Sequence, residues 1–151
     1  MNILNVREYI ETFLKIRTKD GTLMPLRLNQ PQDRMYQAVK SQWDAGKPVR
    51  IIVLKARQMG FSTLTEAIIF AITATRFYTD CMIVAHKDEA TANLFRMSLR
   101  YYENLPEPMK PMRKASNAHE LVFDKPAHYK GRRPGLGSSI KCATAGGSGV
   151  G

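Results

Sequence analysis

The sequence has few of the residues on which disulfide scaffolds and metal sites are built. Its 151 residues include two cysteines and three histidines. Cys81 and Cys142 each stand inside an apolar, strand-like run, so we expect reduced core thiols rather than a disulfide or metal ligands. The histidines are scattered and show no ligand spacing. The composition therefore predicts neither a disulfide framework nor a structural metal site.

Long apolar runs are also lacking. No apolar stretch approaches the roughly 20 residues that a membrane-spanning helix needs. The N-terminus is polar and amphipathic, unlike a signal peptide. We therefore expect a cytoplasmic protein without a membrane partner.

Acidic residues are outnumbered by basic ones. There are 13 Asp and Glu against 23 Lys and Arg, which gives a net charge of +10. This excess favours a polyanionic partner such as nucleic acid, whereas the plainer interpretation is a soluble basic protein. The length indicates one domain, and the 44% apolar content suffices for a core.

Hydrophobic periodicity predicts alternating helices and strands. Helical spacing indicates helices over residues 5–16, 30–45, 62–78 and 88–102. Short apolar runs indicate strands over residues 51–54, 81–85, 120–124 and 138–143, and residues 109–118 read as an irregular basic connector. This order predicts an α/β fold with a mostly parallel sheet. The last two strands lie too close for a helical crossover, so we expect them to pair antiparallel.

The most informative stretch follows the first predicted strand and reads KARQMGFST from Lys55 to Thr63. A strand, a tight polar loop and a helix present backbone N–H groups to an anion, with a hydroxyl for Mg²⁺ at the helix start. Gly60 and Ser62 match the second glycine and the hydroxyl of G-x-x-x-x-G-K-[ST]. Lys55 replaces the first glycine and Phe61 replaces the lysine, so the cation has moved to the front of the loop. The plainer alternative is a strand–turn–helix with solvated charges.

Other segments agree in order and spacing with one family. Besides residues 55–63, these are residues 28–32 (LNQPQ), 82–85 (MIVA), 101–106 (YYENLP) and 137–151. Together they resemble the N-terminal ATPase domain of the large subunit of tailed-phage terminases, the motors that pump DNA into procapsids. The resemblance implies a P-loop NTPase fold of the ASCE, RecA-like type, with a mostly parallel sheet flanked by helices.

The resemblance also implies a division of the chain into two parts. Residues 1–48 would form the N-terminal helices with the adenine motif, and residues 49–151 the first part of the ATPase core. In the family a strand ending in Asp-Glu and then a nuclease domain come next, and this sequence contains neither. We therefore expect an incomplete, N-terminal piece of a longer protein. ATP hydrolysis would belong to the intact protein and be weak or absent here.

The implied cofactors are ATP and Mg²⁺. Lys55 would meet the β- and γ-phosphates, and Ser62 or Thr63 would ligate Mg²⁺. Arg57 would be the catalytic arginine finger, although it could instead pair with an acid and shape the loop. The other loop positions expected at the phosphates are Gln58, Met59, Gly60, Phe61 and Thr63, of which Phe61 would pack beneath the loop.

The motif at residues 28–32 implies an adenine contact. Gln32 could read the base through its amide, which both donates and accepts hydrogen bonds, and Gln30 is the competing candidate. The plainer interpretation is that both are ordinary polar residues at a helix start.

Basic residues gather in the two long connectors, where contact with the phosphate backbone of double-stranded DNA would be independent of sequence. They include Lys110, Arg113, Lys114, Lys130, Arg132 and Arg133. The same loops could instead dock to the portal protein or another subunit. By resemblance the partners are the portal, the small terminase subunit and further copies of the chain, at the procapsid in the host cytoplasm. The alternatives are a helicase-like nucleic-acid ATPase and a non-catalytic basic DNA-binding module.

Overall fold

The computed structural model describes residues 3–54, 59–124 and 135–146. The helices in these ranges are α1 (Ile3–Phe13), α2 (Gln30–Asp44), α3 (Phe61–Thr73), α4 (Asp88–Glu103) and the short 3-10 helix η1 (Glu107–Met109). The strands are β1 (Lys15–Arg17), β2 (Leu23–Pro25), β3 (Asp80–Ala85), β4 (Arg113–Ser116), β5 (Glu120–Phe123) and β6 (Ser139–Thr144). The α/β class is thereby confirmed.

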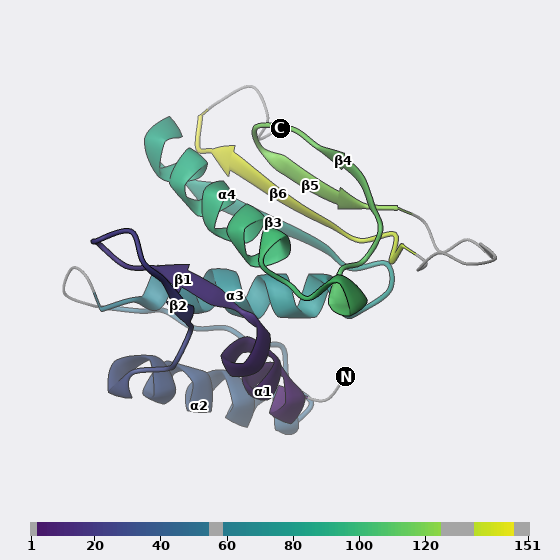
Figure 1. The fold of residues 1–151 in the computed structure, drawn as a ribbon. Coiled ribbons are helices and arrows are strands. Elements are labelled where there is room, and N and C mark those ends of the chain that lie inside the picture. The colour runs from purple at the N-terminus through teal and green to yellow at the C-terminus, as the bar shows by residue number, and fades with distance from the viewer. Residues whose placement is uncertain (1–2, 55–58, 125–134, 147–151) are drawn as a thin grey trace.

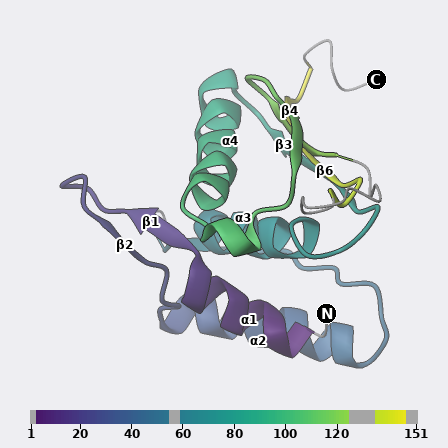
Figure 2. The same cartoon turned by 45° about the vertical axis from the view of Figure 1, so that its right-hand side comes forward.

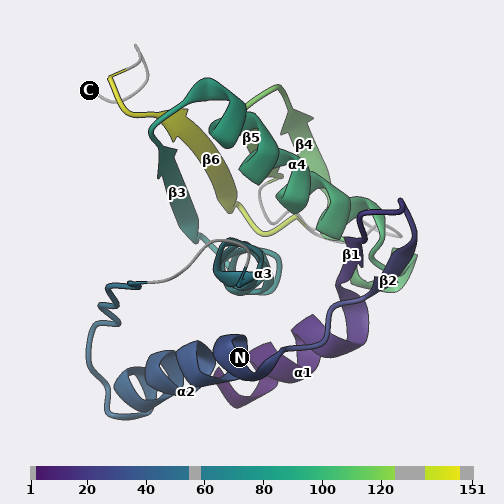
Figure 3. The ribbon, with the colours of Figure 1, turned by 90° about the vertical axis from the view of Figure 1, so that its left-hand side faces the viewer.

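Helix α3 lies between two layers (Figures 1 and 2). One layer is the pair α1–α2, and the other is α4 with the larger sheet. Figure 3 looks nearly along α3 and shows it between the two. Leu64, Ala67, Phe70 and Ala71 of α3 are fully buried because neighbours lie on both sides. No described helix has the length and apolarity that crossing a bilayer requires.

The larger sheet has the strand order β3-β6-β5-β4. Strand β3 pairs parallel with β6, whereas β6 with β5 and β5 with β4 pair antiparallel. The expected antiparallel pairing of the last two predicted strands is thus confirmed. The described sheet is mixed rather than mostly parallel, because α4 separates β3 from the later strands, whereas no described helix lies between β4, β5 and β6.

Two segments differ from their predicted structure because of pairing between distant residues. The connector expected to be irregular contains η1 and β4, whose pairing with β5 makes it the sheet edge. The first helix ends at Phe13, three residues early, because the chain continues into β1, which pairs with β2. Thr18 donates its backbone N–H to Thr22 O (2.9 Å) and closes the turn between β1 and β2.

The prediction of a strand over residues 51–54 is wrong, because the described structure has no strand there. Arg50 is bonded through its backbone N–H (2.8 Å) and carbonyl (3.2 Å) to the Gln42 side chain of α2, which draws this segment away from the sheet. Ile51 and Val53 line a groove with residues of α2 and α3. Ile52 and Leu54 are 100% exposed. The apolar run that suggested a buried strand is therefore largely exposed and has no strand pairing in the described structure.

Among the described strands, β3 is paired on one side only, with β6. Its side chains alternate in exposure, and Met82 and Val84 are each 50% exposed. Phe77 and Tyr78, just before the strand, are also exposed. This edge therefore combines unpaired backbone groups with apolar side chains.

We expect the β3 edge to cause self-association, because such an edge pairs readily with another chain. Light scattering should show an average mass that rises with concentration. Val84→Lys should reduce this association, since a charge opposes edge pairing. Leu23→Lys, at a similarly exposed position on β2, is the control and should change it little. A monodisperse monomer at high concentration would contradict the expectation.

Candidate functional site

The candidate site is centred on Gly60, the residue before α3. Gly60 has a φ of 76°, a left-handed conformation that a residue with a side chain rarely adopts. It turns the chain directly into the helix, and Leu64 N donates to Gly60 O (3.1 Å) as the first helical bond. Lys55, Arg57 and Gln58 lie outside the described residues. The structure therefore describes the second half of the predicted loop.

Within the described part of the chain, no side chain caps the N-terminus of α3. The first N–H groups of a helix have no partner within the helix, and with the helix dipole they favour an anion. The Ser62 side chain is exposed there, whereas Thr63 Oγ1 is turned towards Met97 Sδ of α4 (3.9 Å). Of the two candidate hydroxyls, that of Ser62 is thus the accessible one. Mg²⁺ takes many of its ligands from phosphates and water, and a protein hydroxyl at this place can supply one more.

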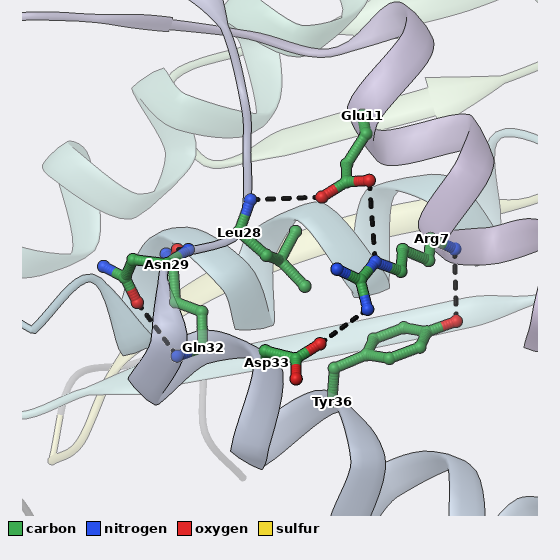
Figure 4. A network of polar contacts seen from close by, with 7 residues as sticks. All are labelled: Arg7, Glu11, Leu28, Asn29, Gln32, Asp33 and Tyr36. Atoms are coloured by element: carbon green, nitrogen blue, oxygen red, sulfur yellow. Dashed lines mark hydrogen bonds and ion pairs between the residues drawn. The ribbon is translucent and has the colours of Figure 1, made fainter.

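Gln32 sits beside this turn and is buried, with 4% of its surface exposed. It forms a capping box with Asn29 at the start of α2 (Figure 4): Gln32 N donates to Asn29 Oδ1 (2.9 Å), and Asn29 N donates to Gln32 Oε1 (3.0 Å). Gln32 Nε2 donates to Gly60 O (2.8 Å). Both ends of the amide are therefore engaged within the protein. Gln30, in contrast, is exposed.

A polar network places this capping box against α1 (Figure 4). Arg7 pairs with Glu11 (3.5 Å) and with Asp33 of α2 (2.5 Å). Leu28 N donates to Glu11 Oε1 (3.2 Å). These contacts fix the chain just before Asn29. The sequence analysis did not single out Arg7 or Glu11, and their i, i+4 spacing was the available signal.

A cavity of about 330 Å³ lies next to Met59 and Phe61, a volume at the lower end of the range for small-molecule pockets. Its described walls come from α2, residues 51–54 and the start of α3. The described lining residues are apolar apart from one arginine: Pro31, Arg34, Met35, Ile51, Ile52, Val53, Leu54, Met59 and Phe61. Phe61 is half-buried here, next to the loop.

Glu66, one turn further along α3, is a second feature that the sequence analysis missed. It is 1% exposed and accepts a hydrogen bond from Ser98 Oγ of α4 (2.8 Å). Burial raises the pKa of its carboxyl from 4.5 to about 7. Burial and the charge of Glu66 together raise the pKa of the Cys142 thiol to about 12. A lone acid within the apolar run of α3 was the signal in the sequence.

We expect Glu66 to make stability depend on pH. The pKa of the Glu66 carboxyl is higher in the folded chain than in the unfolded chain. Its contribution to the free energy of unfolding is therefore fully present below pH 4.5 and is lost as the pH rises towards 7. The full cost above pH 7 is of order 3 kcal/mol. Glu66→Gln keeps a hydrogen-bonding amide without the charge and should remove most of this loss.

Chemical denaturation of the wild type, Glu66→Gln and an exposed control, Glu103→Gln, at pH 5 and pH 8 measures the effect. The advantage of Glu66→Gln over the wild type should be much larger at pH 8 than at pH 5. Glu103→Gln should show no such change, because Glu103 is exposed. Equal pH dependence in the wild type and Glu66→Gln would refute the assignment.

The described residues of the basic connectors lie near β4, at the opposite sheet edge from β3. Lys110 Nζ pairs with Glu107 Oε1 (2.6 Å), and the Arg113 guanidinium lies 5.4 Å from the Tyr102 ring centroid. Lys114 is exposed. Lys130, Arg132 and Arg133 lie outside the described residues. The structure thus describes half of the residues that we predicted to contact DNA, and these lie away from the β3 edge.

Comparison with known proteins gives an informative likeness in structure. No family model matches the sequence, and no curated protein matches it. The fold is similar to the crystal structure of the HK97 bacteriophage large terminase, with a TM-score of 0.73 and 19% sequence identity. The match covers 99% of this chain and 28% of that one, so the chain spans little more than a quarter of that protein's length. At this identity the likeness establishes a terminase-like fold, which confirms the resemblance at that level.

Proposed function

We propose that this chain is the nucleotide-binding, N-terminal part of the ATPase of a phage terminase large subunit. In the intact motor it would bind ATP and Mg²⁺ to power the movement of double-stranded DNA into procapsids. One observation carries the proposal: in a terminase-like fold, left-handed Gly60 leads into the N-terminus of α3, which no described side chain caps and where the Ser62 hydroxyl is exposed. This arrangement suits a polyphosphate better than a neutral ligand.

The residues at this turn would divide the work of holding the nucleotide. N–H groups at the start of α3 would donate to phosphate oxygens, and Ser62 would ligate Mg²⁺. Mg²⁺ supplies neutralisation of phosphate charge and a template for the triphosphate. Lys55 and Arg57 keep the roles that the resemblance gives them, as phosphate cation and arginine finger.

Hydrolysis requires a base or a water-positioning group in addition to this cradle. Glu66 is unsuited to that role, because it is buried and bonded to Ser98 rather than directed to the exposed helix start. In the family the acid comes from a later strand. We therefore expect this chain to bind nucleotide and to hydrolyse it weakly or not at all.

DNA contact forms a further part of the proposal. The net charge of +10 and the exposed Lys114 support contact with a phosphate backbone. Lys110 pairs with Glu107, and the Arg113 guanidinium lies over the Tyr102 ring. These contacts order both basic side chains and do not neutralise the charge of the whole cluster. The portal, the small subunit and further copies of the chain remain the proposed protein partners.

Isothermal titration calorimetry with Mg-ATP and a non-hydrolysable analogue tests nucleotide binding. Lys55→Ala should raise the Kd about tenfold or more, roughly 1.4 kcal/mol, because the phosphates lose their cation. Lys47→Ala, which changes an exposed lysine after α2, is the matched control and should leave the Kd unchanged. Absence of binding by a folded wild type, or equal Kd values for Lys55→Ala and the wild type, would contradict the proposal.

A further inference from the structure

The amide of Gln32 is hydrogen-bonded at both ends within the protein, although the motif at residues 28–32 implies that it contacts adenine. Its oxygen accepts from Asn29 N (3.0 Å), and its nitrogen donates to Gly60 O (2.8 Å). The side chain is 4% exposed, so a ligand has little access to the remaining capacity of the amide. Reading adenine would require the side chain to leave this buried position and its two hydrogen bonds to rearrange.

The carbonyl that Gln32 holds belongs to the residue that sets the geometry of the loop. Gly60 O also accepts from Leu64 N (3.1 Å), so one oxygen receives the first helical bond of α3 and the Gln32 amide. The fit is close: a Cβ on Gly60 would lie 2.6 Å from Gln32 Nε2. The contact therefore joins the start of α2 to the start of α3 across 28 residues of sequence.

The other side of the capping box is held in place as well. The polar network of Arg7, Glu11 and Asp33 ties α1 to α2 and to the residue preceding Asn29 (Figure 4). Gln32 consequently reaches Gly60 from a fixed support. Support of this kind gives a side chain the precision needed to orient a binding loop.

We propose that Gln32 is a positioning residue that orients the phosphate-binding turn through the Gly60 carbonyl and does not read the base. The consequence for ligands rests on the proposed nucleotide function. A positioning role affects every ligand that uses the turn, because the phosphates are common to all. A base-reading role affects adenine nucleotides alone.

Binding of Mg-ATP, Mg-GTP and magnesium tripolyphosphate by wild type and Gln32→Met separates these two roles. Gln32→Met keeps a side chain of similar length but forms neither bond, and it should weaken all three ligands by a similar factor of about tenfold. Gln37→Ala, which changes an exposed glutamine further along α2, should alter none of them. Weakening of Mg-ATP alone, with tripolyphosphate unaffected, would overturn the proposal.

Two further variants separate the Gly60 contact from the helix cap. Gln32→Glu keeps an acceptor for Asn29 N but loses the donor to Gly60 O, so it preserves the cap alone. Asn29→Ala removes the other half of the cap and leaves the Gly60 contact in place. Hydrogen exchange of the Leu64 amide in the nucleotide-free protein reports the contact directly, because that amide shares the Gly60 oxygen.

Exchange at Leu64 should be about tenfold faster in Gln32→Met and Gln32→Glu than in the wild type, and close to the wild-type rate in Asn29→Ala and Gln37→Ala. Unchanged exchange in both Gln32 variants would overturn the positioning role, whatever the nucleotide data show. Failure of the wild type to bind ATP and tripolyphosphate would instead refute the proposed function. The exchange result still decides the Gln32 proposal in that case.

Discussion

The burial of α3 from two sides is the constraint on which the rest of the structure depends. Leu64, Ala67, Phe70 and Ala71 are fully buried between the α1–α2 pair and the layer of α4 and the sheet. Burial of a large apolar side chain contributes roughly 1.5–3 kcal/mol to stability. Displacing α3 would lose such contributions, because it would expose apolar surface in both layers. The N-terminus of α3 is therefore held at a fixed place on the molecule. A rigid helix start of this kind suits a site that must hold an anion in a defined orientation.

Polar contacts along the first two turns refine that position. Gln32 holds Gly60 O from the α2 side. From the α4 side, Tyr101 OH donates to Thr63 O (3.1 Å) and Ser98 Oγ donates to Glu66 (2.8 Å). Burying polar groups costs free energy unless they are paired, so these bonds favour one arrangement of α3 over other equally apolar ones. The candidate site thus depends on contacts from both layers.

The sequence predicted the elements whose signal is local. Periodicity placed all four α-helices, and apolar runs placed β3, β5 and β6, because each pattern is contained in its own segment. Strand β4 was missed, and residues 51–54 were taken as a strand, because both outcomes depend on distant partners: β5 in one case and Gln42 in the other. The turn at Gly60 was predicted from its place before a helix. The hydrogen bond from Gln32 and the burial of Glu66 required the tertiary structure.

A polyphosphate bound at the start of α3 should change the amide chemical shifts of that turn, which an NMR titration with Mg-ATP measures. We expect the largest changes at Gly60, Phe61, Ser62 and Thr63, with small changes at residues 110–114 near β4. Large changes at residues 110–114 with none at the start of α3 would contradict it, because the nucleotide would then be bound only as a polyanion on the basic surface.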